Sequence, residues 1–526
     1  MTLSRRTEAL WRDFDICAAK SDWSGAKNAL AFILELEPGD AFALLQMSYI
    51  ESLHGSYRLA REFTLEACRT GSTDAAVLSD LCNRLRTFNE AWALRGLIAT
   101  AVLDPRIQPS LLVSFAGQLG NLNDSQAAIM LLDQAKTRFP SSPDVLIARS
   151  GALIHLGRFD EAETELTRAL AASPANAYGH WLLSRLRKQS KGSNHITRLE
   201  QLLQVTKQNA GIALLAFALH KELDDLQDYA RAWQSLALGC QAKRSNLDYQ
   251  SSETEHLVSR LIEFPVIAAE EHVTPASEDR MPIFIVGMHR SGTTLLEQLL
   301  SGHGEVQGIG ELYDFTSQMR YATDHHCKGV MDATLVERAR FIDFFDVGRR
   351  YLSGIEWRLN SERCFTDKLP SNFLNIGFIC RALPQARILH MVRDPMETCF
   401  SNLRELYSDA NPYSYDQIEL TDYFLQYQRL MRHWHAVYPG RILDIDYGEL
   451  TRDPQRVMQG AATFCGLEFQ SGMLDLLSRT RGVATASAVQ VRDKVIARAR
   501  PKWEPYGEYL QPMIRRLESA QFHKRD

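Results

Sequence analysis

The sequence of 526 residues lacks several features that define large protein classes. No apolar run approaches the ~20 residues that a membrane-spanning helix needs. The N-terminal segment MTLSRRTEALWRDFDI has no apolar core of the kind that signal peptides carry. Lysine and arginine number 59 against 64 acidic residues, and the net charge of −5 gives no support for a role in binding nucleic acid or an anionic membrane.

Cysteine is sparse and offers no recognisable framework. The nine cysteines are scattered and include no CxxC pair, which favours reduced thiols over disulfides or a structural zinc site. The run His325, His326 and Cys327 has no second pair of ligands near it in the sequence, so we expect no metal there. These features predict a cytoplasmic protein with no membrane span, no nucleic-acid partner and no metal.

The first half of the sequence does contain a repeat, with a period of 34 residues. Small or apolar residues share one phase, and alanines recur seven residues later: Ala26, Ala60, Leu94, Ala128, Ala162, then Ala67, Ala101, Ala135 and Ala169. In the clearest unit, LGRFDEAETELTRALAASP, Gly157 marks a turn between two helices and Pro174 closes the second. We place Tyr229, Ala230 and Ala237 in the same phase two periods further on.

This repeat resembles the tetratricopeptide repeat, a helix pair of the same length with small, aromatic and proline residues at these positions. Small side chains let the paired helices approach, and each pair buries its apolar face by stacking on its neighbours. An unrelated helical bundle is the alternative, against which the shared period and phase argue. We expect residues 1–245 to form an α-solenoid whose concave surface binds a protein or peptide.

A change of class follows the repeats. Residues 246–280 are polar and are expected to form a linker with a short helix around residues 256–263. From Met281, apolar strands alternate with amphipathic helices, which predicts an α/β domain with a mainly parallel sheet over residues 281–526.

An anion-binding loop is predicted in the segment PIFIVGMHRSGTTLLEQLL. The buried strand 283–286 leads into a glycine loop and then a helix, the geometry that directs backbone N–H groups at a phosphate. Gly287 and Gly292 have the spacing of a P-loop, but Thr293 stands where a nucleotide triphosphatase has lysine. The loop therefore suits a nucleotide with a single 5′ phosphate, favours sulfuryl transfer over ATP hydrolysis and argues against a P-loop kinase.

A second anion site is predicted where the strand 388–392 ends. Arg393 follows that strand, and Ser401 lies on the helix predicted over residues 396–406. Both could converge on one phosphate, the arginine by a forked charged bond and the serine by its hydroxyl. A structural ion pair between Arg393 and Asp394 is the alternative.

Together, the segments RSGTTL and RDP-x5-S resemble the 5′ and 3′ phosphate motifs of sulfotransferases that use 3′-phosphoadenosine 5′-phosphosulfate (PAPS). Residues 308–312, 366–370, 446–450 and 486–503 resemble further motifs of the tyrosylprotein sulfotransferases, in the same order. The resemblance covers residues 281 to about 515, and fusion to a tetratricopeptide array is familiar in bacterial proteins. It implies PAPS as donor, its desulfated product PAP (adenosine 3′,5′-bisphosphate), and no metal.

The resemblance also implies roles for individual residues. Glu311 would accept the proton of the acceptor hydroxyl, with Asp314 as the alternative, while Lys368 and Arg290 would meet charge on the bridging and sulfuryl oxygens. Ser487 would contact the sulfate. The nucleotide would be bound by Arg290, Ser291, Gly292, Thr293, Thr294 and Leu295 at the 5′ phosphate, by Arg393 and Ser401 at the 3′ phosphate, and by Tyr447, Gln490 and Lys502.

Three positions depart from the family. His289 stands where proline is common in the family. Glu405 stands where the tyrosylprotein enzymes have a second arginine, and Arg404 lies one residue earlier. The basic segment 493–500 is expected to reinforce anion binding. The expected acceptor is a hydroxyl or phenol on a protein tyrosine, peptide, glycan or small metabolite. The alternative is a scaffold protein with a vestigial catalytic domain, which the intact Glu311, Lys368 and Arg393 disfavour.

Overall fold

A computed structural model of the protein describes residues 3–265, 280–476 and 500–522. The chain forms two compact units, one of Met1–Phe139 with Tyr313–Asp343 and one of Pro140–Leu312 with Phe344–Asp526. Each unit therefore combines repeat helices with residues from the predicted α/β domain. The domain limits at residues 245 and 280 remain a prediction.

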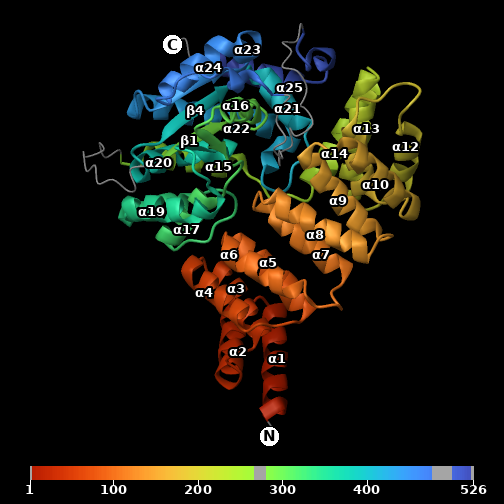
Figure 1. Ribbon diagram of the computed structural model, residues 1–526, viewed down its shortest axis with the longest axis vertical. Coiled ribbons are helices and arrows are strands. Elements are labelled where there is room, and N and C mark those ends of the chain that lie inside the picture. The colour runs from red at the N-terminus through yellow and green to blue at the C-terminus, as the bar shows by residue number, and fades with distance from the viewer. Residues whose placement is uncertain (1–2, 266–279, 477–499, 523–526) are drawn as a thin grey trace. The chain divides into compact units, whose positions relative to one another are not determined.

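The repeat region is helical throughout its described part, and successive helices pair antiparallel (Figure 1). The first unit holds α1 (Leu3–Ala19), α2 (Trp23–Leu36), α3 (Ala41–Leu53), α4 (Tyr57–Arg69), α5 (Ala75–Thr87), α6 (Ala91–Ala101), α7 (Pro109–Asn121) and α8 (Ser125–Arg138). The second holds α9 (Pro143–Leu156), α10 (Phe159–Ala172), α11 (Ala177–Leu186), α12 (Ile196–Val205), α13 (Asn209–Asp225), α14 (Tyr229–Arg244) and α15 (Ser251–Ile262).

The predicted helix contacts of the repeat are confirmed. Ala26, Ala60, Leu94, Ala128 and Ala162 are all buried on the second helix of a pair. In two of these pairs, a serine twelve residues earlier on the first helix donates to the carbonyl oxygen of the small residue. The bonds run from Ser48 Oγ to Ala60 O at 2.6 Å and from Ser150 Oγ to Ala162 O at 3.3 Å. Gly157 has a left-handed φ of 78° at the turn after α9.

The predicted phase is wrong in the last pair. Ala230 and Ala237 are exposed, whereas Ala232 and Gly239 hold the buried small positions. His220 Nδ1 bonds Ala232 O at 2.9 Å, twelve residues apart as in the earlier pairs. The interval from Ala162 to Ala232 is 70 residues, whereas two periods of 34 make 68. The irregular connection between α11 and α12 lies within this interval and interrupts the period.

The predicted parallel sheet is confirmed in the second unit. Its five strands lie in the order β2-β3-β1-β4-β5, and every neighbouring pair is parallel. They are β1 (Met281–Gly287), β2 (Val306–Gly308), β3 (Cys364–Asp367), β4 (Arg387–Val392) and β5 (Ile442–Asp446). Because all five run in one direction, their carboxyl ends meet at one edge of the sheet, where open α/β sheets bind ligands.

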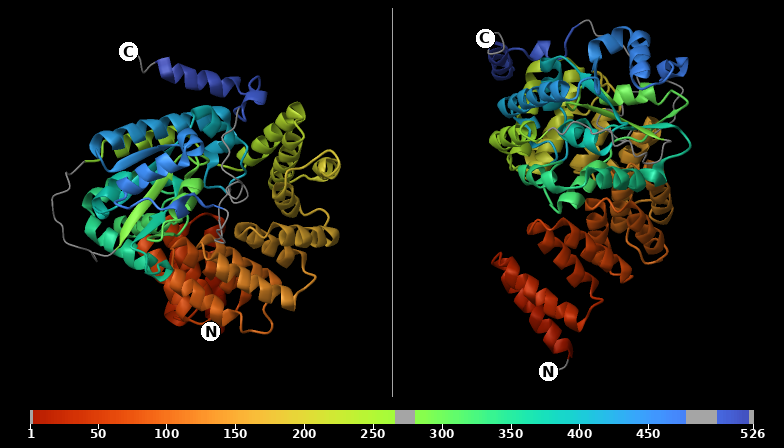
Figure 2. Two further views of the ribbon diagram at one scale, coloured as in Figure 1. Left: turned by 45° about the horizontal axis from the view of Figure 1, so that its top comes forward. Right: turned by 90° about the vertical axis from the view of Figure 1, so that its left-hand side faces the viewer.

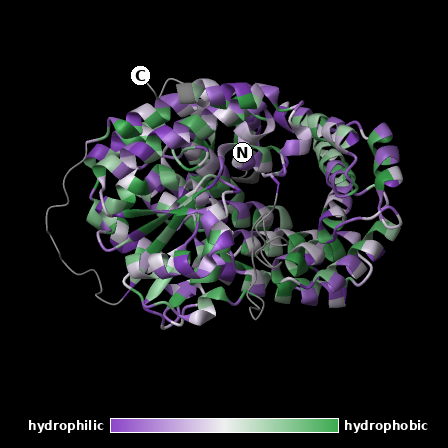
Figure 3. Cartoon of the chain, turned by 90° about the horizontal axis from the view of Figure 1, so that it is seen from above, coloured by the Kyte–Doolittle hydropathy of each residue, from purple (hydrophilic) through white to green (hydrophobic). Residues whose placement is uncertain are grey.

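Helices cover both faces of this sheet. On one face, α16 (Thr293–Leu300) and α24 (Pro454–Phe464) pack on Ile283, Leu389 and Ile445. On the other, the ring of Tyr351 in α19 (Phe344–Ile355) lies 5.8 Å from that of Phe284. Figure 2 shows the strands side by side, and Figure 3 shows them as hydrophobic. This buried sheet forms the domain core.

The other α-helices described in the α/β part of the second unit are α20 (Ile376–Ala382), α21 (Pro395–Leu403), α22 (Gln417–Val437), α23 (Tyr447–Arg452) and α25 (Gln511–Phe522).

Two helices from the α/β half of the sequence belong to the first unit instead. They are α17 (Asp314–Thr323) and α18 (Ala333–Arg338), which lie in the segment Tyr313–Asp343 between β2 and β3. The Tyr57 hydroxyl of α4 bonds Ser317 Oγ of α17 at 3.0 Å, and Ser317 Oγ donates to Phe88 O at 3.2 Å. An insertion after β2 thus completes the core of the N-terminal repeats, which no periodicity in the sequence indicated.

Two further findings concern the whole described chain. All nine cysteines are free thiols. In the parts of the chain that the structure describes, no helix is both long enough and apolar enough to cross a membrane.

Candidate active site

The glycine loop between β1 and α16 has the backbone that its sequence predicts. Gly287 has a φ of 150° and Gly292 a φ of 112°, values that favour glycine. A Cβ atom at Gly287 would lie 2.7 Å from the carbonyl oxygen of Met391, and one at Gly292 would lie 2.5 Å from the Tyr447 ring. Both glycines therefore allow a close approach that any side chain would block.

The loop leads into a buried helix start. Thr293, Thr294 and Leu295 open α16 and are buried, and Gly292 is the residue before its first turn. The Ser291 hydroxyl is also buried, and it has no hydrogen-bond partner among the described residues. A buried hydroxyl of this kind at the N-terminus of a helix is a fitting place for an anion such as a phosphate.

The structure brings the two predicted anion motifs together. Arg290 Nε donates to Ser401 Oγ at 3.3 Å, and Arg393 Nη1 donates to the Arg290 carbonyl oxygen at 3.0 Å. Asn402 Nδ2 donates to the carbonyl oxygen of His289 at 2.7 Å. The glycine loop and α21 are thus joined by direct hydrogen bonds.

Arg393 lies at the carboxyl end of β4 in a defined setting. Its guanidinium carbon is 4.6 Å from the centre of the Tyr447 ring, a cation–π contact. Its Nη2 pairs with Glu397 rather than with Asp394, which instead caps α21 by accepting from Glu397 N at 2.9 Å. The other oxygen of Glu397 accepts from Lys502 N at 2.8 Å, which connects the C-terminal segment to this site.

Glu311 and Lys368 meet at the same edge of the sheet. Lys368 directly follows β3 and is fully buried, and its Nζ donates to Glu311 Oε1 at 2.5 Å. Buried Glu297 of α16 holds this corner, because its Oε1 accepts from Gly310 N at 2.8 Å and from Thr366 Oγ1 at 3.1 Å. Asp314, the alternative to Glu311, begins α17 and belongs to the other compact unit.

The departures from the family have physical consequences. His289 bonds Tyr413 through its Nδ1 at 3.2 Å. Desolvation, with the positive charges of Lys368 and Arg290, lowers the pKa of His289 to about 4, so its ring is neutral at neutral pH. Glu405 is buried and lies 3.6 Å from Arg290 Nη1. Arg404 Nη2 instead pairs with Asp224 of α13 at 2.5 Å, so Arg404 does not take the place of the second arginine of the tyrosylprotein enzymes.

Several residues of the site were not predicted from the sequence. Glu297 binds the Gly310 turn, Glu397 binds Arg393, and Asn402 binds the glycine loop. Each of the three nevertheless occupies an ordinary helical position. Only the spacing of Glu397 four residues after Arg393 indicated a possible helix-end pair. Ser487, Gln490 and most of the basic segment 493–500 lie outside the described residues.

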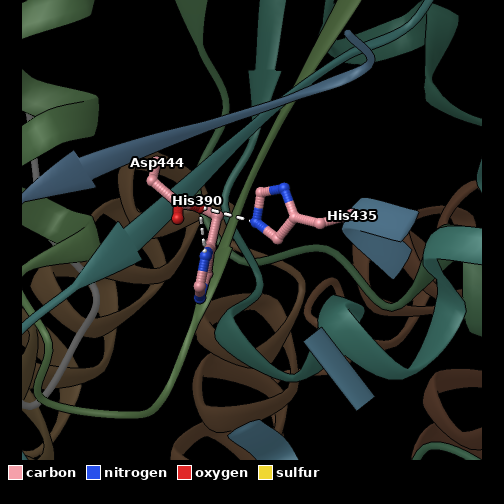
Figure 4. Close-up of side chains that lie close together, drawn as sticks. All are labelled: His390, His435 and Asp444. Atoms are coloured by element: carbon pink, nitrogen blue, oxygen red, sulfur yellow. Dashed lines mark hydrogen bonds and ion pairs between the residues drawn. The ribbon is translucent and has the colours of Figure 1, made fainter. Parts of the chain in front are cut away.

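One side-chain cluster resembles a metal site. Among the described residues, the ligand atoms of His390 (β4), His435 (α22) and Asp444 (β5) lie within 4.8 Å of one another (Figure 4). His390 Nδ1 and His435 Nε2 each lie 2.8 Å from Asp444 Oδ1, and His390 Nε2 bonds the Tyr427 hydroxyl. Desolvation lowers the pKa of His390. Because hydrogen bonds already satisfy these atoms, we assign the cluster a structural role.

The geometry defines the chemistry that this edge can support. The glycine loop, Lys368, Arg393 and Tyr447 follow the ends of β1, β3, β4 and β5, and Glu311 follows β2 by three residues. Two sets of anion-binding groups and a partly exposed carboxylate therefore lie at one edge. Such a set suits transfer of a charged group from a nucleotide with two separate phosphates.

Comparisons with known proteins identify what two segments of the chain are similar to. Residues 282–471 match the model of the Sulfotransferase family, and residues 122–186 match that of the tetratricopeptide repeat. An uncharacterized protein of Aquifex aeolicus (strain VF5) is 29% identical over 412 residues, 76% of this chain and 53% of the relative, so the chain spans about half of that protein. Protein-tyrosine sulfotransferase 2 of Gallus gallus is 24% identical over 303 residues, 52% of this chain and 81% of the relative.

Solved structures include partial matches to both halves. A sulfotransferase from Alicyclobacillus acidocaldarius overlaps 46% of this chain and 95% of its own, at 20% identity and a TM-score of 0.27. The TPR protein YrrB overlaps 40% of this chain and 98% of its own, at 15% identity and a TM-score of 0.26. The family matches show that this chain carries tetratricopeptide repeats and a sulfotransferase-family domain.

Proposed function

We propose that the protein transfers the sulfuryl group of PAPS to an acceptor hydroxyl or phenol. One observation carries the proposal: Arg290 and Arg393, one from each anion motif, are joined by a 3.0 Å hydrogen bond at the edge that also holds Glu311 and Lys368. PAPS has a phosphate at each end of its ribose, and few other common nucleotides do. The fit explains why the loop needs no lysine for a triphosphate.

Different residues at the sheet edge would bind the 5′ phosphate and the 3′ phosphate of the donor. The 5′ phosphate would lie on the N–H groups of residues 291–295, with the unpaired Ser291 hydroxyl as an additional donor. The 3′ phosphate would lie between Arg393 and Ser401, and Tyr447 would support the Arg393 guanidinium. Lys502, through its backbone bond to Glu397, would bring the C-terminal segment against the donor.

The reaction would proceed by in-line attack. The acceptor oxygen forms a bond to sulfur while the bond from sulfur to the 5′-phosphate oxygen breaks, and PAP leaves with that electron pair. Glu311 would take the acceptor proton. Lys368 and Arg290 would stabilise the negative charge on the sulfuryl and leaving oxygens, since both are buried cations beside the loop.

The acceptor and the array's partner are proposed more broadly. The likeness to Protein-tyrosine sulfotransferase 2 favours a tyrosine phenol as acceptor, with glycans and small metabolites as other hydroxyl sources. The array would recruit a protein or peptide. Tyr178 of α11 supports this, because it is an exposed aromatic ring stacked on Trp181 at 5.7 Å. The free cysteines fit a reducing compartment such as the cytoplasm.

Transfer of label tests the proposal directly. The full chain is incubated with 35S-labelled PAPS and a cell lysate, and label is followed into polypeptide, carbohydrate and small molecules. We expect PAPS-dependent label in one fraction. Binding of PAP without any transfer would instead support the scaffold alternative, and binding of neither PAPS nor PAP would contradict the proposed donor.

The 3′ phosphate provides a second measurement. Arg393→Ala should weaken PAP binding far more than binding of adenosine 5′-monophosphate, which lacks the 3′ phosphate. Exposed Arg456→Ala, which removes an arginine paired with Glu449, is the matched control. Equal losses for the two nucleotides would show that Arg393 does not bind the 3′ phosphate.

A further inference from the structure

Glu405 connects the repeat array with the glycine loop. It is buried, and its carboxylate is shared between two arginines. Glu405 Oε1 lies 2.8 Å from Arg185 Nη1 of α11, and Glu405 Oε2 lies 3.6 Å from Arg290 Nη1. All three residues belong to the second compact unit, and α11 ends the segment that matches the tetratricopeptide model.

The negative charge of Glu405 lies between the positive charges of Arg185 and Arg290. Arg290 needs its positive charge for the donor, and Glu405 is a negative charge beside it in a site that excludes water. A buried carboxylate of this kind is tolerated only when it is paired. Arg185 makes the shorter contact, so it satisfies most of the charge of Glu405 and leaves Arg290 available to a phosphate.

Arg185 is itself held in place by its own helix. Its guanidinium carbon lies 4.5 Å from the centre of the Trp181 ring, one turn earlier on α11. Stacking of this kind fixes the plane of the guanidinium, which lysine cannot reproduce. The array therefore presents a fixed cation to Glu405.

We propose that Arg185 is a positioning residue of the donor site, which acts by neutralising Glu405 and thereby limits the attraction of Glu405 for Arg290, the residue that would bind the 5′ end of the donor. The repeat array is then part of the donor site as well as a surface for partners. This inference rests on the proposed function, because its ligand is PAP or PAPS.

Double-mutant analysis of PAP binding to the full chain tests the inference. Arg185→Ala should weaken PAP binding by roughly tenfold, because the unpaired Glu405 then draws Arg290 away and repels the phosphate. Glu405→Gln removes that charge, so Arg185→Ala in a Glu405→Gln background should cost less than about twofold. Arg187→Ala is the control on the same helix end, since Arg187 pairs with exposed Asp160.

The possible results separate the proposals. A Glu405→Gln background that leaves the Arg185→Ala loss unchanged would show that Arg185 is merely structural, as would full PAP affinity in Arg185→Ala alone. Melting temperatures of the variants, with PAP binding measured well below each of them, separate a loss of affinity from unfolding. Absence of PAP binding in the wild type would overturn the proposed donor and this inference with it, whereas normal binding with no coupling overturns the inference alone.

Discussion

At the scale of residues, the candidate site depends on pairs of opposite charge. Lys368 is paired with Glu311, Arg393 with Glu397, and Arg290 with Glu405. Each pair puts a carboxylate beside a cation that would meet the donor. The carboxylates offset part of the cost of burying these cations, and they set how strongly each cation can attract a phosphate or sulfuryl oxygen.

Glu311 is the one acid of these three that the resemblance makes catalytic. Glu311→Gln should lower turnover by about a hundredfold or more, because an amide cannot accept the acceptor proton. PAP affinity should stay within about twofold, since Glu311 is not placed on either phosphate. Steady-state sulfuryl transfer and calorimetric PAP binding measure the two effects.

The control for this change is Glu305→Gln, an exposed acid before β2 that pairs with Arg363. It should change neither quantity. If Glu311→Gln lost PAP binding and turnover together, the carboxylate would be needed to hold Lys368 in place and would not be the base.

At the scale of elements, α21 is the helix on which the donor site depends. Arg393 lies two residues before its start, its last turns carry Ser401 and Asn402, and residues at its end contact the array. Arg404 pairs with Asp224 of α13, and Cys240 Sγ of α14 donates to Leu403 O at 3.5 Å. The repeat helices thus hold the end of the helix that binds the glycine loop.

Asp224 is the residue through which this contact can be tested. It accepts from Arg404 at 2.5 Å and from the Tyr506 hydroxyl at 2.6 Å. Burial opposes its charge, but Arg404 and the Tyr506 bond hold the pKa of Asp224 below its ordinary value. Asp224→Ala should destabilise the protein by about 3 kcal/mol, because it leaves Arg404 half-buried without a partner.

Thermal or denaturant unfolding gives the measurement. Asp228→Ala on the same connection removes an exposed partner of Arg231 and should cost less than about 1 kcal/mol. Similar losses for the two variants would mean that the contact between α13 and α21 contributes little.

At the scale of the molecule, the repeat helices α9 to α15 and the parallel sheet belong to one compact unit. Within the second unit, Arg244 of α14 makes a double ion pair with Glu419 of α22 at 2.8 Å, and Lys243 of α14 pairs with Asp409 at 2.7 Å. Removal of residues 1–245 would expose these polar groups and the apolar surface around buried Tyr506.

We therefore expect the fragment 246–526 to be poorly soluble and to bind PAP much more weakly than the full chain. Size-exclusion chromatography and calorimetry on both chains check this. A soluble fragment with full PAP affinity would show that the array serves only to recruit partners.

Acid should destabilise the whole protein in a defined pH range. Buried His220 of α13 has a pKa of about 4, lowered by desolvation and by Arg404, against about 6.5 in an unfolded chain. Between these values the unfolded chain binds the proton and the folded chain does not, so stability is lost as the pH falls from about 6.5 to 4. For His220 alone this amounts to on the order of 3 kcal/mol.

Melting temperatures measured from pH 7 to pH 4 test this dependence. His220→Gln keeps a donor for Ala232 O and should flatten the acid side of the curve, whereas exposed His256→Gln should leave it unchanged. An unaltered curve in His220→Gln would assign the acid sensitivity to other groups.

The sequence-based predictions succeeded where a feature depends on residues close in the sequence and failed mainly where it depends on residues far apart. The strand 283–286, the glycines of the loop and the buried alanines of the repeats were predicted correctly, because each depends on neighbours close in sequence. The phase error at Ala230 arose where an irregular connection interrupts the period. Glu297 and Asn402 escaped prediction because their partners lie on other elements, whereas Arg393, a partner of Glu397, is only four residues away.

The sequence by itself determined the two kinds of architecture and the residue types of both anion motifs, because periodicity and glycine spacing act locally. Only the tertiary structure decided that α17 completes the N-terminal repeats, that Arg290 and Arg393 meet, and that Glu405 is shared with Arg185 of the array. The physical reason is that a charge or hydroxyl finds its partner in space, wherever the packing of helices on a parallel sheet brings distant segments together.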